Sequence, residues 1–206
     1  MKSKIVLIRH GITTGNVRRL YYGATDVPLA DKGEKQLEEL RDDGLYPIND
    51  SAQFFTTGML RTEQTLRIIY GEREHEVIED LKELDFGIFE MKCYEELEGN
   101  PDYEEWISAQ DEAKPPPNGE SIMNFKKRVR RGFKELLIKH ELHILKLRNR
   151  GEEAMSICIC HGGTISGILN DLWPDRYDYF YSWIPDPGHG YVLTMEDGKI
   201  VSDERF

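Results

Sequence analysis

Hydrophobic positions follow two periods along the chain, and the short continuous runs predict buried strands. Residues 4–9 carry the run IVLI before Arg9, and residues 154–161 read AMSICICH, the most continuous apolar run in the chain. Runs of this length are typical of strands covered on both faces of a sheet. We expect further strands over residues 52–57 and within 77–84, and a closing hairpin that turns at Asp197-Gly198.

Longer segments repeat their apolar positions with the helical period. Helices are predicted over residues 29–44, 60–71 and 164–173, and a long helix follows Ser121 and runs towards Arg150. Strands and helices therefore alternate along the chain. This order predicts an α/β fold, a three-layer α/β/α sandwich with a mainly parallel central sheet.

The length of 206 residues is typical of one domain, and residues 1–206 are expected to form it. The segment at about 86–120 breaks the alternation, because it is acidic and aromatic and ends in PPPNG. We interpret it as an insertion over the edge of the sheet that sets specificity. The composition, with 39% hydrophobic and 32% charged residues, is that of a soluble globular protein.

Charge and cysteine content narrow the possible partners and compartment. The formal net charge of −11 argues against nucleic acid and anionic membranes as partners, although a local pocket can still bind a small anion. No apolar run is long enough to cross a membrane, and the N-terminus has no signal-peptide cleavage pattern. Three cysteines, an odd and sparse set, fit a reducing cytoplasm. Cys158 and Cys160 are expected to lie on one face of a strand as inert thiols.

Basic side chains follow three of the predicted strands. The first strand ends in Arg9-His10-Gly11, the strand over 52–57 leads into a helix that carries Arg61, and the strand over 154–161 ends in His161 before two glycines. Ligands of open α/β sheets bind beyond the carboxyl ends of the strands, where helix N-termini add positive potential. A single histidine or arginine there is usually structural. The coincidence at three positions predicts a receptor for a compact dianion such as phosphate.

These same residues carry a resemblance to a known family. The stretch RHGITTGN resembles the R-H-G-x-T-x-x-N signature of the histidine phosphatase superfamily, also called phosphoglycerate mutase-like. Further stretches resemble family motifs in the family's order over nearly the whole chain: YYGATDVPLADKGEKQ, TTGMLRTEQT, LKELDFGIFEM, PPPNGES and CHGGTISGIL. The resemblance implies the phosphoglycerate mutase-like α/β/α fold.

The resemblance also implies roles for single residues. His10 would be the nucleophile that takes the phosphoryl group and forms phosphohistidine. Three cations, Arg9, Arg61 and a protonated His161, would hold the phosphate oxygens, so that neither a metal nor a cofactor is needed. Glu83 would donate a proton to the leaving oxygen and then act as base for water. Neighbouring cations should keep His10 neutral, and a hydrogen bond to its other nitrogen should fix the tautomer.

Four further positions are expected to bind the substrate, a small-molecule phosphate monoester. Asn16 and the Gly162 amide would add hydrogen bonds to the phosphate, and Tyr22 and Gly23 would contact the rest of the substrate. The chain also departs from the family pattern, because Thr57-Gly58 replaces Ser-Pro and Met91 replaces glycine near the expected pocket rim. In the insertion, an apolar substrate wall or simple packing explains the aromatic residues Phe86, Phe89, Tyr94, Tyr103 and Trp106.

Hydrolysis is favoured over mutase activity, because DFGIFEMKCYEEL resembles the phosphatase form and the chain is short for a mutase. Phosphatases of α-ribazole phosphate, of sugar phosphates and of broad specificity share this layout. A cofactor-dependent phosphoglycerate mutase and a non-catalytic phospho-ligand-binding member remain alternatives. A metallohydrolase is disfavoured, because Arg9 would repel a metal. His189 in a late loop is interpreted as a turn residue, and the basic run at 126–134 as a solvated helix face. Nothing in the sequence indicates an oligomeric state.

Overall fold

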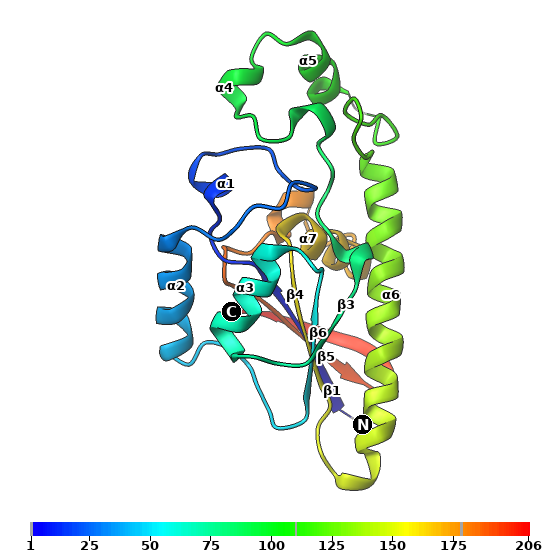
Figure 1. The fold of residues 1–206 in the computed structure, drawn as a ribbon. Helices are drawn as coiled ribbons and strands as arrows, with labels where there is room; N and C mark the ends of the chain where they lie inside the picture. Colours follow the sequence, from blue (N-terminus) through cyan, green and yellow to red (C-terminus); the bar gives the residue numbers. More distant parts are fainter. Residues whose placement is uncertain (1, 110, 178) are drawn as a thin grey trace.

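A six-stranded sheet forms the centre of the molecule (Figure 1). The computed structural model describes residues 2–109, 111–177 and 179–206. Its strands are β1 (Lys2–Arg9), β2 (Ala52–Thr56), β3 (His75–Val77), β4 (Met155–Cys160), β5 (Gly190–Glu196) and β6 (Lys199–Arg205). Their order is β3-β2-β4-β1-β5-β6; the first four run parallel, whereas β5 is antiparallel to β1 and to β6. The expected mainly parallel sheet is confirmed.

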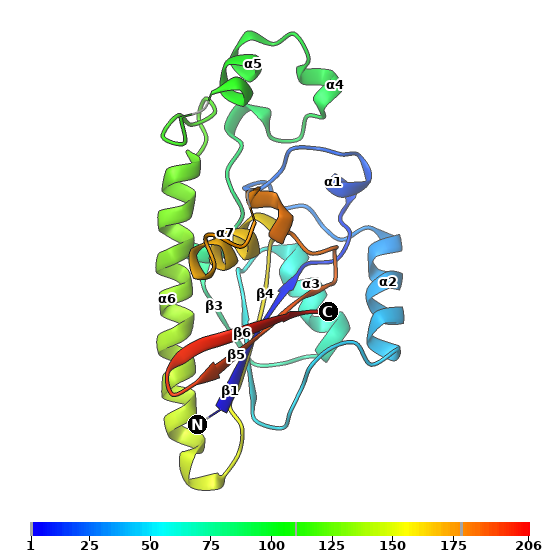
Figure 2. The same ribbon diagram turned by 180° about the vertical axis from the view of Figure 1, so that it is seen from behind.

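Helices cover both faces of this sheet (Figures 1 and 2). The side chains of Ile5 and Leu7 pack with helices α6 (Ile122–Leu147) and α7 (Gly162–Leu172). Those of Val6 and Ile8 pack on the other face, with α2 (Asp31–Asp42) and α3 (Leu60–Tyr70). The alternation follows from the period of two along a strand. The expected three-layer sandwich is therefore confirmed. The short helices are α1 (Thr14–Val17), α4 (Tyr94–Leu97) and α5 (Pro101–Ser108).

Two expectations about the middle of the chain need correction. The strand expected within 77–84 is β3, which lies mostly before that range and has three exposed residues; residues 79–81 form a 3₁₀ turn. The segment 86–120 lies beyond the carboxyl ends of the strands rather than over an edge of the sheet (Figure 1). Phe89, Leu97 and Tyr103 form a small core of its own there. A short apolar pattern could not distinguish a strand from the turn that follows it.

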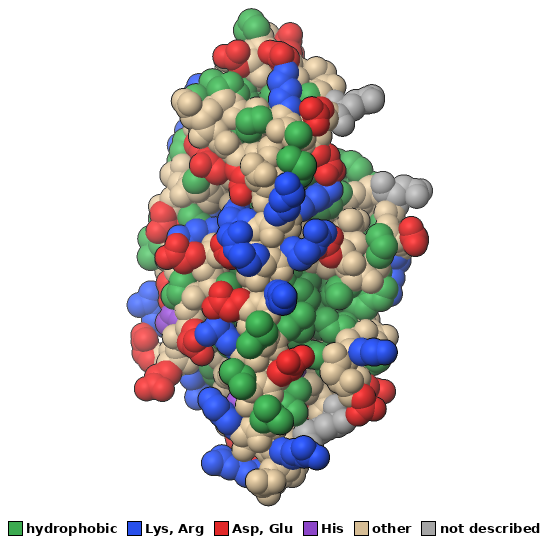
Figure 3. All heavy atoms as spheres, turned by 90° about the vertical axis from the view of Figure 1, so that its right-hand side faces the viewer, with side chains coloured by type: hydrophobic (Ala, Val, Ile, Leu, Met, Phe, Trp, Pro, Cys, Tyr) green, Lys and Arg blue, Asp and Glu red, His purple; other side chains and the backbone are tan. Residues whose placement is uncertain are grey.

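Helix α6 shows the expected separation of a buried and a charged face. Its Ser121 cap accepts a hydrogen bond from the backbone N–H of Asn124. The basic run at 126–134 lies on the outer surface, where blue and red side chains are interspersed (Figure 3). Arg130 pairs with Asp171, and Lys126 pairs with Glu112. The prediction of a solvated face is confirmed for the exposed basic residues of the run, but not for the half-buried Arg128. No helix in the described ranges is long and apolar enough to cross a membrane.

The cysteines behave as the strand pattern predicts. Cys158 and Cys160 are fully buried in the core cluster that lies under α6 and α7, so their side chains share one face of β4. Cys93 is half-buried, and all three thiols are free. Burial raises the pKa of the Cys160 thiol well above 9, which keeps it protonated and unreactive.

A buried histidine joins α6 to the sheet. His140 is fully buried, and its ring nitrogens hydrogen-bond to the hydroxyls of Ser156 on β4 (2.7 Å) and Ser3 on β1 (2.9 Å). Burial lowers the pKa of His140 from 6.5 to about 4, with a smaller contribution from His143. The folded protein therefore holds this imidazole neutral at pH values where an unfolded chain would protonate it.

Lowering the pH should therefore reduce the free energy of unfolding of the wild type more than that of a His140→Gln variant. Between pH 6.5 and 4 the unfolded state binds this proton and the folded state does not, so stability is lost as the pH falls. The difference corresponds to about 2–3 kcal/mol. Urea unfolding at pH 7 and at pH 4.5 measures it. Other buried histidines affect both proteins equally, so parallel pH profiles for the two proteins would contradict this account.

Candidate active site

The three basic strand ends converge as expected. Strands β2, β4 and β1 are adjacent and parallel, so Thr57, His161 and His10 leave the sheet at the same edge. A pocket of about 190 Å³ lies there. Seven of the nine predicted site residues and several apolar side chains line it. The predicted ones are Arg9, His10, Asn16, Tyr22, Arg61 and Glu83, joined by the predicted Gly162 at the start of α7.

His10 is held as a neutral imidazole with one nitrogen available. Its Nδ1–H donates to the Gly11 carbonyl (2.8 Å), so Nε2 carries the lone pair. Burial lowers the pKa of His10 well below 6.5, and the charges of Arg61 and Arg9 lower it further. His10 is 4% exposed and lines the pocket. This is the arrangement that a nucleophilic histidine requires.

Two arginines supply the positive charge of the pocket. Arg61 is fully buried, and its guanidinium donates to the carbonyls of Gly23 (2.8 Å) and Thr25 (3.0 Å). Arg9 donates to the Pro185 carbonyl (2.8 Å), while its buried Nε has no partner within the described ranges. No carboxylate in those ranges lies within ion-pair distance of either arginine. A buried donor without a partner in a pocket wall indicates that a ligand acceptor completes the site.

The hydrogen bonds of His161 favour a neutral ring in this arrangement, whereas its protonation in contact with phosphate stays a prediction. Its Nδ1 accepts a hydrogen bond from Arg61 Nε (3.2 Å), and its Nε2 donates to the Thr57 hydroxyl (2.9 Å). Burial lowers the pKa of His161 well below 6.5, as do the charges of Arg61 and neighbouring groups. His161 is not among the pocket-lining residues; its ring packs at 5.3 Å from the His10 ring. Its contact with phosphate stays a prediction.

The departure at Thr57-Gly58 has a structural basis. The Thr57 hydroxyl accepts a hydrogen bond from His161. Gly58 has a φ of 75°, which a proline ring cannot adopt, so the turn into α3 differs in backbone from one that contains Ser-Pro. The hydrogen bond to His161 is retained although the stiffness of proline is lost.

Glu83 is bound to the first turn of α7. Its Oε2 accepts from the Gly163 backbone N–H (2.8 Å), and its Oε1 accepts from the Leu84 N–H (3.0 Å). A Cβ on Gly163 would lie 2.4 Å from Oε1, so only glycine permits this contact. None of the other acids near Glu83 in sequence, Glu79, Asp80 and Asp85, lines the pocket. The assignment made from the motif agrees with this placement.

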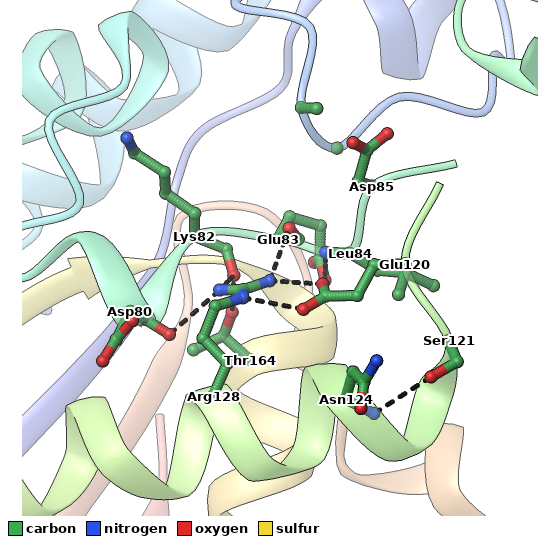
Figure 4. Close-up of polar contacts among 12 residues, drawn as sticks. Asp80, Lys82, Glu83, Leu84, Asp85, Glu120, Ser121, Asn124, Arg128 and Thr164 are labelled. Carbon is green, nitrogen blue, oxygen red and sulfur yellow. Dashed lines mark hydrogen bonds and ion pairs between the residues drawn. The ribbon is translucent and has the colours of Figure 1, made fainter. Parts of the chain in front are cut away.

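Arg128 on α6 holds the backbone that carries Glu83 (Figure 4). Its guanidinium donates to the carbonyls of Asp80 (3.0 Å), Lys82 (2.9 Å) and Glu83 (3.1 Å). The same group forms a two-pronged ion pair with Glu120 (2.7 and 2.9 Å). Sequence reasoning missed Arg128, because it lies within a run of exposed basic residues that masks its different environment.

The remaining predicted substrate-binding residues form a small network. Asn16 Oδ1 accepts from the Thr13 backbone N–H (3.0 Å), which directs its amide group to the pocket. The Thr13 hydroxyl donates to that of Tyr22 (2.6 Å), and the Tyr22 ring lies 5.3 Å from the Arg61 guanidinium. Gly23 does not line the pocket. A Cβ there would lie 1.6 Å from the Leu84 carbonyl, so Gly23 is needed for close backbone packing.

Glu90 connects the segment 86–120 to the arginine site, and it was not predicted. Its carboxylate accepts from the backbone N–H groups of Gly23 (2.8 Å), Thr25 (3.0 Å) and Phe86 (3.0 Å), and also of Ala24. The carbonyls of this same Gly23–Thr25 loop hold Arg61. The only signal in the sequence for this role was that Glu90 lies within LKELDFGIFEM, one of the stretches that resemble a family motif.

Of the five aromatic residues proposed for a substrate wall, Phe86 lines this pocket and Trp106 lines an adjoining cavity. The packing interpretation holds for Phe89 and Tyr103, which are buried, whereas Tyr94 is exposed. Sequence reasoning missed Tyr21, Phe180 and Tyr181, which also line the pocket. Neither Met91 nor His189 is among the lining residues. No group of three or more His, Cys, Asp or Glu in the described ranges is placed to hold a metal.

Comparison with known proteins agrees with this geometry. An Escherichia coli K12 protein named adenosylcobalamin/alpha-ribazole phosphatase is 29% identical over 183 residues, 85% of each chain. A Schizosaccharomyces pombe phosphoglycerate mutase is 28% identical over 213 residues, covering 97% of this chain and 94% of its own.

Structural similarity points to the same fold. A solved Escherichia coli structure, described as an alpha-ribazole-5'-P phosphatase, superposes with a TM-score of 0.76 over 99% of this chain and 94% of its own. At 22% identity this likeness supports the fold alone. The family model of the histidine phosphatase superfamily (branch 1) matches residues 5–205. The chain, with its neutral His10 between two unpaired arginines, therefore belongs to the histidine phosphatase superfamily, branch 1.

Proposed function

We propose that the chain is a metal-independent phosphomonoesterase that hydrolyses a small phosphorylated metabolite through a phosphohistidine on His10. The observation that carries the proposal is the site of His10: a neutral ring whose tautomer is fixed by Gly11, beside the unpartnered Nε of Arg9. A phosphate monoester supplies both an electrophile for the free nitrogen and acceptor oxygens for the unpaired donors.

In the first step, His10 Nε2 attacks phosphorus while the bond to the ester oxygen breaks. Arg9 and Arg61 neutralise charge on the equatorial oxygens, and the Asn16 amide and the Gly162 N–H supply further donors. Glu83 gives its proton to the leaving oxygen, which departs as a neutral alcohol. The phosphoryl group is then bonded to Nε2.

In the second step, water attacks the phosphohistidine. Glu83, now a carboxylate, takes a proton from the water, and the bond from phosphorus to Nε2 breaks. Inorganic phosphate leaves, and His10 is again neutral because burial and the two arginines disfavour its protonated form. His161 acts by orienting Arg61 through Nδ1.

The number of cations in the pocket favours hydrolysis over a mutase reaction, in which the phosphoryl group would return to a phosphoglycerate. Arg9 and Arg61 are the only cationic side chains among the described lining residues, and both are taken up by one phosphate. A phosphoglycerate would need a further cation for its carboxylate. The relative named as an alpha-ribazole phosphatase makes phosphorylated ribosides of that kind candidate substrates. The three free thiols support a cytoplasmic location.

Phosphate release from p-nitrophenyl phosphate in excess EDTA tests the proposal, together with alkaline quenching to trap an acid-labile phosphoenzyme. Turnover with a phosphohistidine at residue 10 is expected. Loss of turnover on chelation, or turnover without a phosphoenzyme, would overturn it. A parallel assay with 3-phosphoglycerate and 2,3-bisphosphoglycerate tests the mutase alternative, which isomerisation faster than hydrolysis would support.

A Gly163→Ala variant tests the role of Glu83. The added methyl group would collide with Glu83 Oε1 and displace the carboxylate. We expect kcat to fall about 10²-fold or more, the size of a general acid–base contribution. Stability should stay within about 1 kcal/mol, because alanine favours a helix. The matched control is Gly167→Ala in the same helix, whose Cβ meets Val129 at an ordinary 3.4 Å. Equal loss in both variants would contradict a specific effect on Glu83.

A further inference from the structure

A second, larger cavity of about 680 Å³ adjoins the catalytic pocket. The two cavities share five lining residues, so they lie directly beside each other. The shared residues are Tyr21, Phe86, Ile122, Phe180 and Tyr181. The larger cavity, called the outer chamber here, is further lined by Trp106 and Ile107 of α5 and by Tyr179. In Figure 1, α5 lies beyond the carboxyl ends of the parallel strands, the edge at which the catalytic residues leave the sheet.

The walls of the outer chamber are aromatic and well supported. The Tyr21 ring lies edge-on to Phe86 (5.4 Å) and to Trp106 (6.2 Å). Its hydroxyl is bound to that of the buried Tyr103 (2.6 Å), so this wall rests on the small core of the insertion. In the segment before β5, Tyr181 packs against Tyr179 (5.2 Å) and Phe180. Such rings offer flat apolar faces to a ligand.

The cations around the outer chamber are already paired. Its two lysines are Lys126, which binds Glu112 (2.6 Å), and Lys114, which binds Glu105. Asp111 adds a further negative charge to the lining. No unpaired cation therefore remains among the described lining residues for a second anionic group. A substrate with a carboxylate or a second phosphate would lose hydration there without gaining a partner.

We propose that the outer chamber is the leaving-group subsite, and that it selects phosphate monoesters of alcohols that carry an uncharged, flat aromatic ring. The inference rests on the proposed function and deepens it. The phosphate binds between Arg9 and Arg61, and the ring lies between the aromatic side chains of the insertion and those of residues 179–181. The wide chamber admits a ring system larger than a single sugar.

Three esters of primary alcohols with similar leaving groups test the proposal. They are 2-(2-naphthyl)ethyl phosphate, n-butyl phosphate and 2-(4-carboxyphenyl)ethyl phosphate. We expect kcat/KM for the naphthyl ester to exceed that for the butyl ester about 10-fold or more, since each good aromatic contact adds to the area buried. The carboxylated ester should be hydrolysed no faster than the butyl ester. A preference for the carboxylated ester would overturn the proposal.

Two variants distinguish the loss of an aromatic ring in the outer chamber from the loss of one elsewhere on the surface. Tyr179→Ala removes an exposed ring that lines only the outer chamber, and it should lower the naphthyl-to-butyl ratio several-fold towards one. Tyr94→Ala removes an exposed ring of the insertion that lines neither cavity, and it should leave the ratio unchanged. Equal turnover of the naphthyl and butyl esters by the wild type would contradict the aromatic subsite but would be consistent with the proposed phosphatase activity. No turnover of either ester would instead count against the proposed function.

Discussion

Replacement of His10 by alanine is expected to lower kcat/KM by about 10⁴-fold or more, as for other enzymes that lose their nucleophile. No other described side chain in the pocket offers a neutral imidazole nitrogen, because His161 uses both of its nitrogens in hydrogen bonds. The measurement is phosphate release at saturating and at low substrate concentration. The trapped phosphoenzyme should disappear together with the activity.

His189→Gln is the matched control for this experiment. His189 lies in the loop before β5, outside the pocket lining, so its replacement should change kcat/KM by no more than about 2-fold. Circular dichroism establishes that both variants are folded. A folded His10→Ala protein that keeps a tenth of the wild-type rate would show that His10 is not the nucleophile.

Loss of Arg61 should have the second-largest effect. In Arg61→Ala we expect kcat to fall about 10³-fold or more, the magnitude found when an arginine that stabilises a transferring phosphoryl group is removed. The carbonyls of Gly23 and Thr25 and the Nδ1 of His161 also lose their donor. Each buried acceptor left unpaired costs about 1–3 kcal/mol, so the variant should also be less stable.

The pH profile of Arg61→Ala separates charge from folding. The Arg61 charge lowers the pKa of His10, so its removal should raise that pKa and move the acidic limb of kcat/KM to higher pH. Arg67→Ala, an exposed position on the same helix, is the control and should leave both rate and profile unchanged. An unshifted acidic limb in Arg61→Ala would contradict the electrostatic account of His10.

Local patterns predicted the parts of this molecule whose environment depends on near neighbours in sequence. The parallel sheet followed from apolar runs such as residues 154–161, and His10, Arg9 and Arg61 followed from their places after predicted strands. Arg128 and Glu90 escaped prediction because most of their partners are backbone groups of distant segments, and a sequence pattern does not record such contacts.

The hydrogen bonds that favour a neutral His161 were not foreseen, for a similar reason. A histidine among arginines and phosphate oxygens looks cationic when residues are read as a motif. The structure shows that Arg61 directs its Nε–H at Nδ1, and a ring nitrogen that accepts from a guanidinium cannot carry a proton. The outer chamber was also missed in part, because Tyr179–Tyr181 approach Trp106 only through the fold.

The four amide contacts of Glu90 bear on how members of this superfamily can diverge. One carboxylate ties the base of the insertion to the loop whose carbonyls grip Arg61. The outer parts of the insertion, α4 and α5, make none of these contacts and are free to change in length and side chains. A chimaera that exchanges only α4 and α5 should therefore acquire a new ligand preference and keep its chemistry. A chimaera that also exchanges Glu90 should lose activity, because the loop that positions Arg61 would no longer be held.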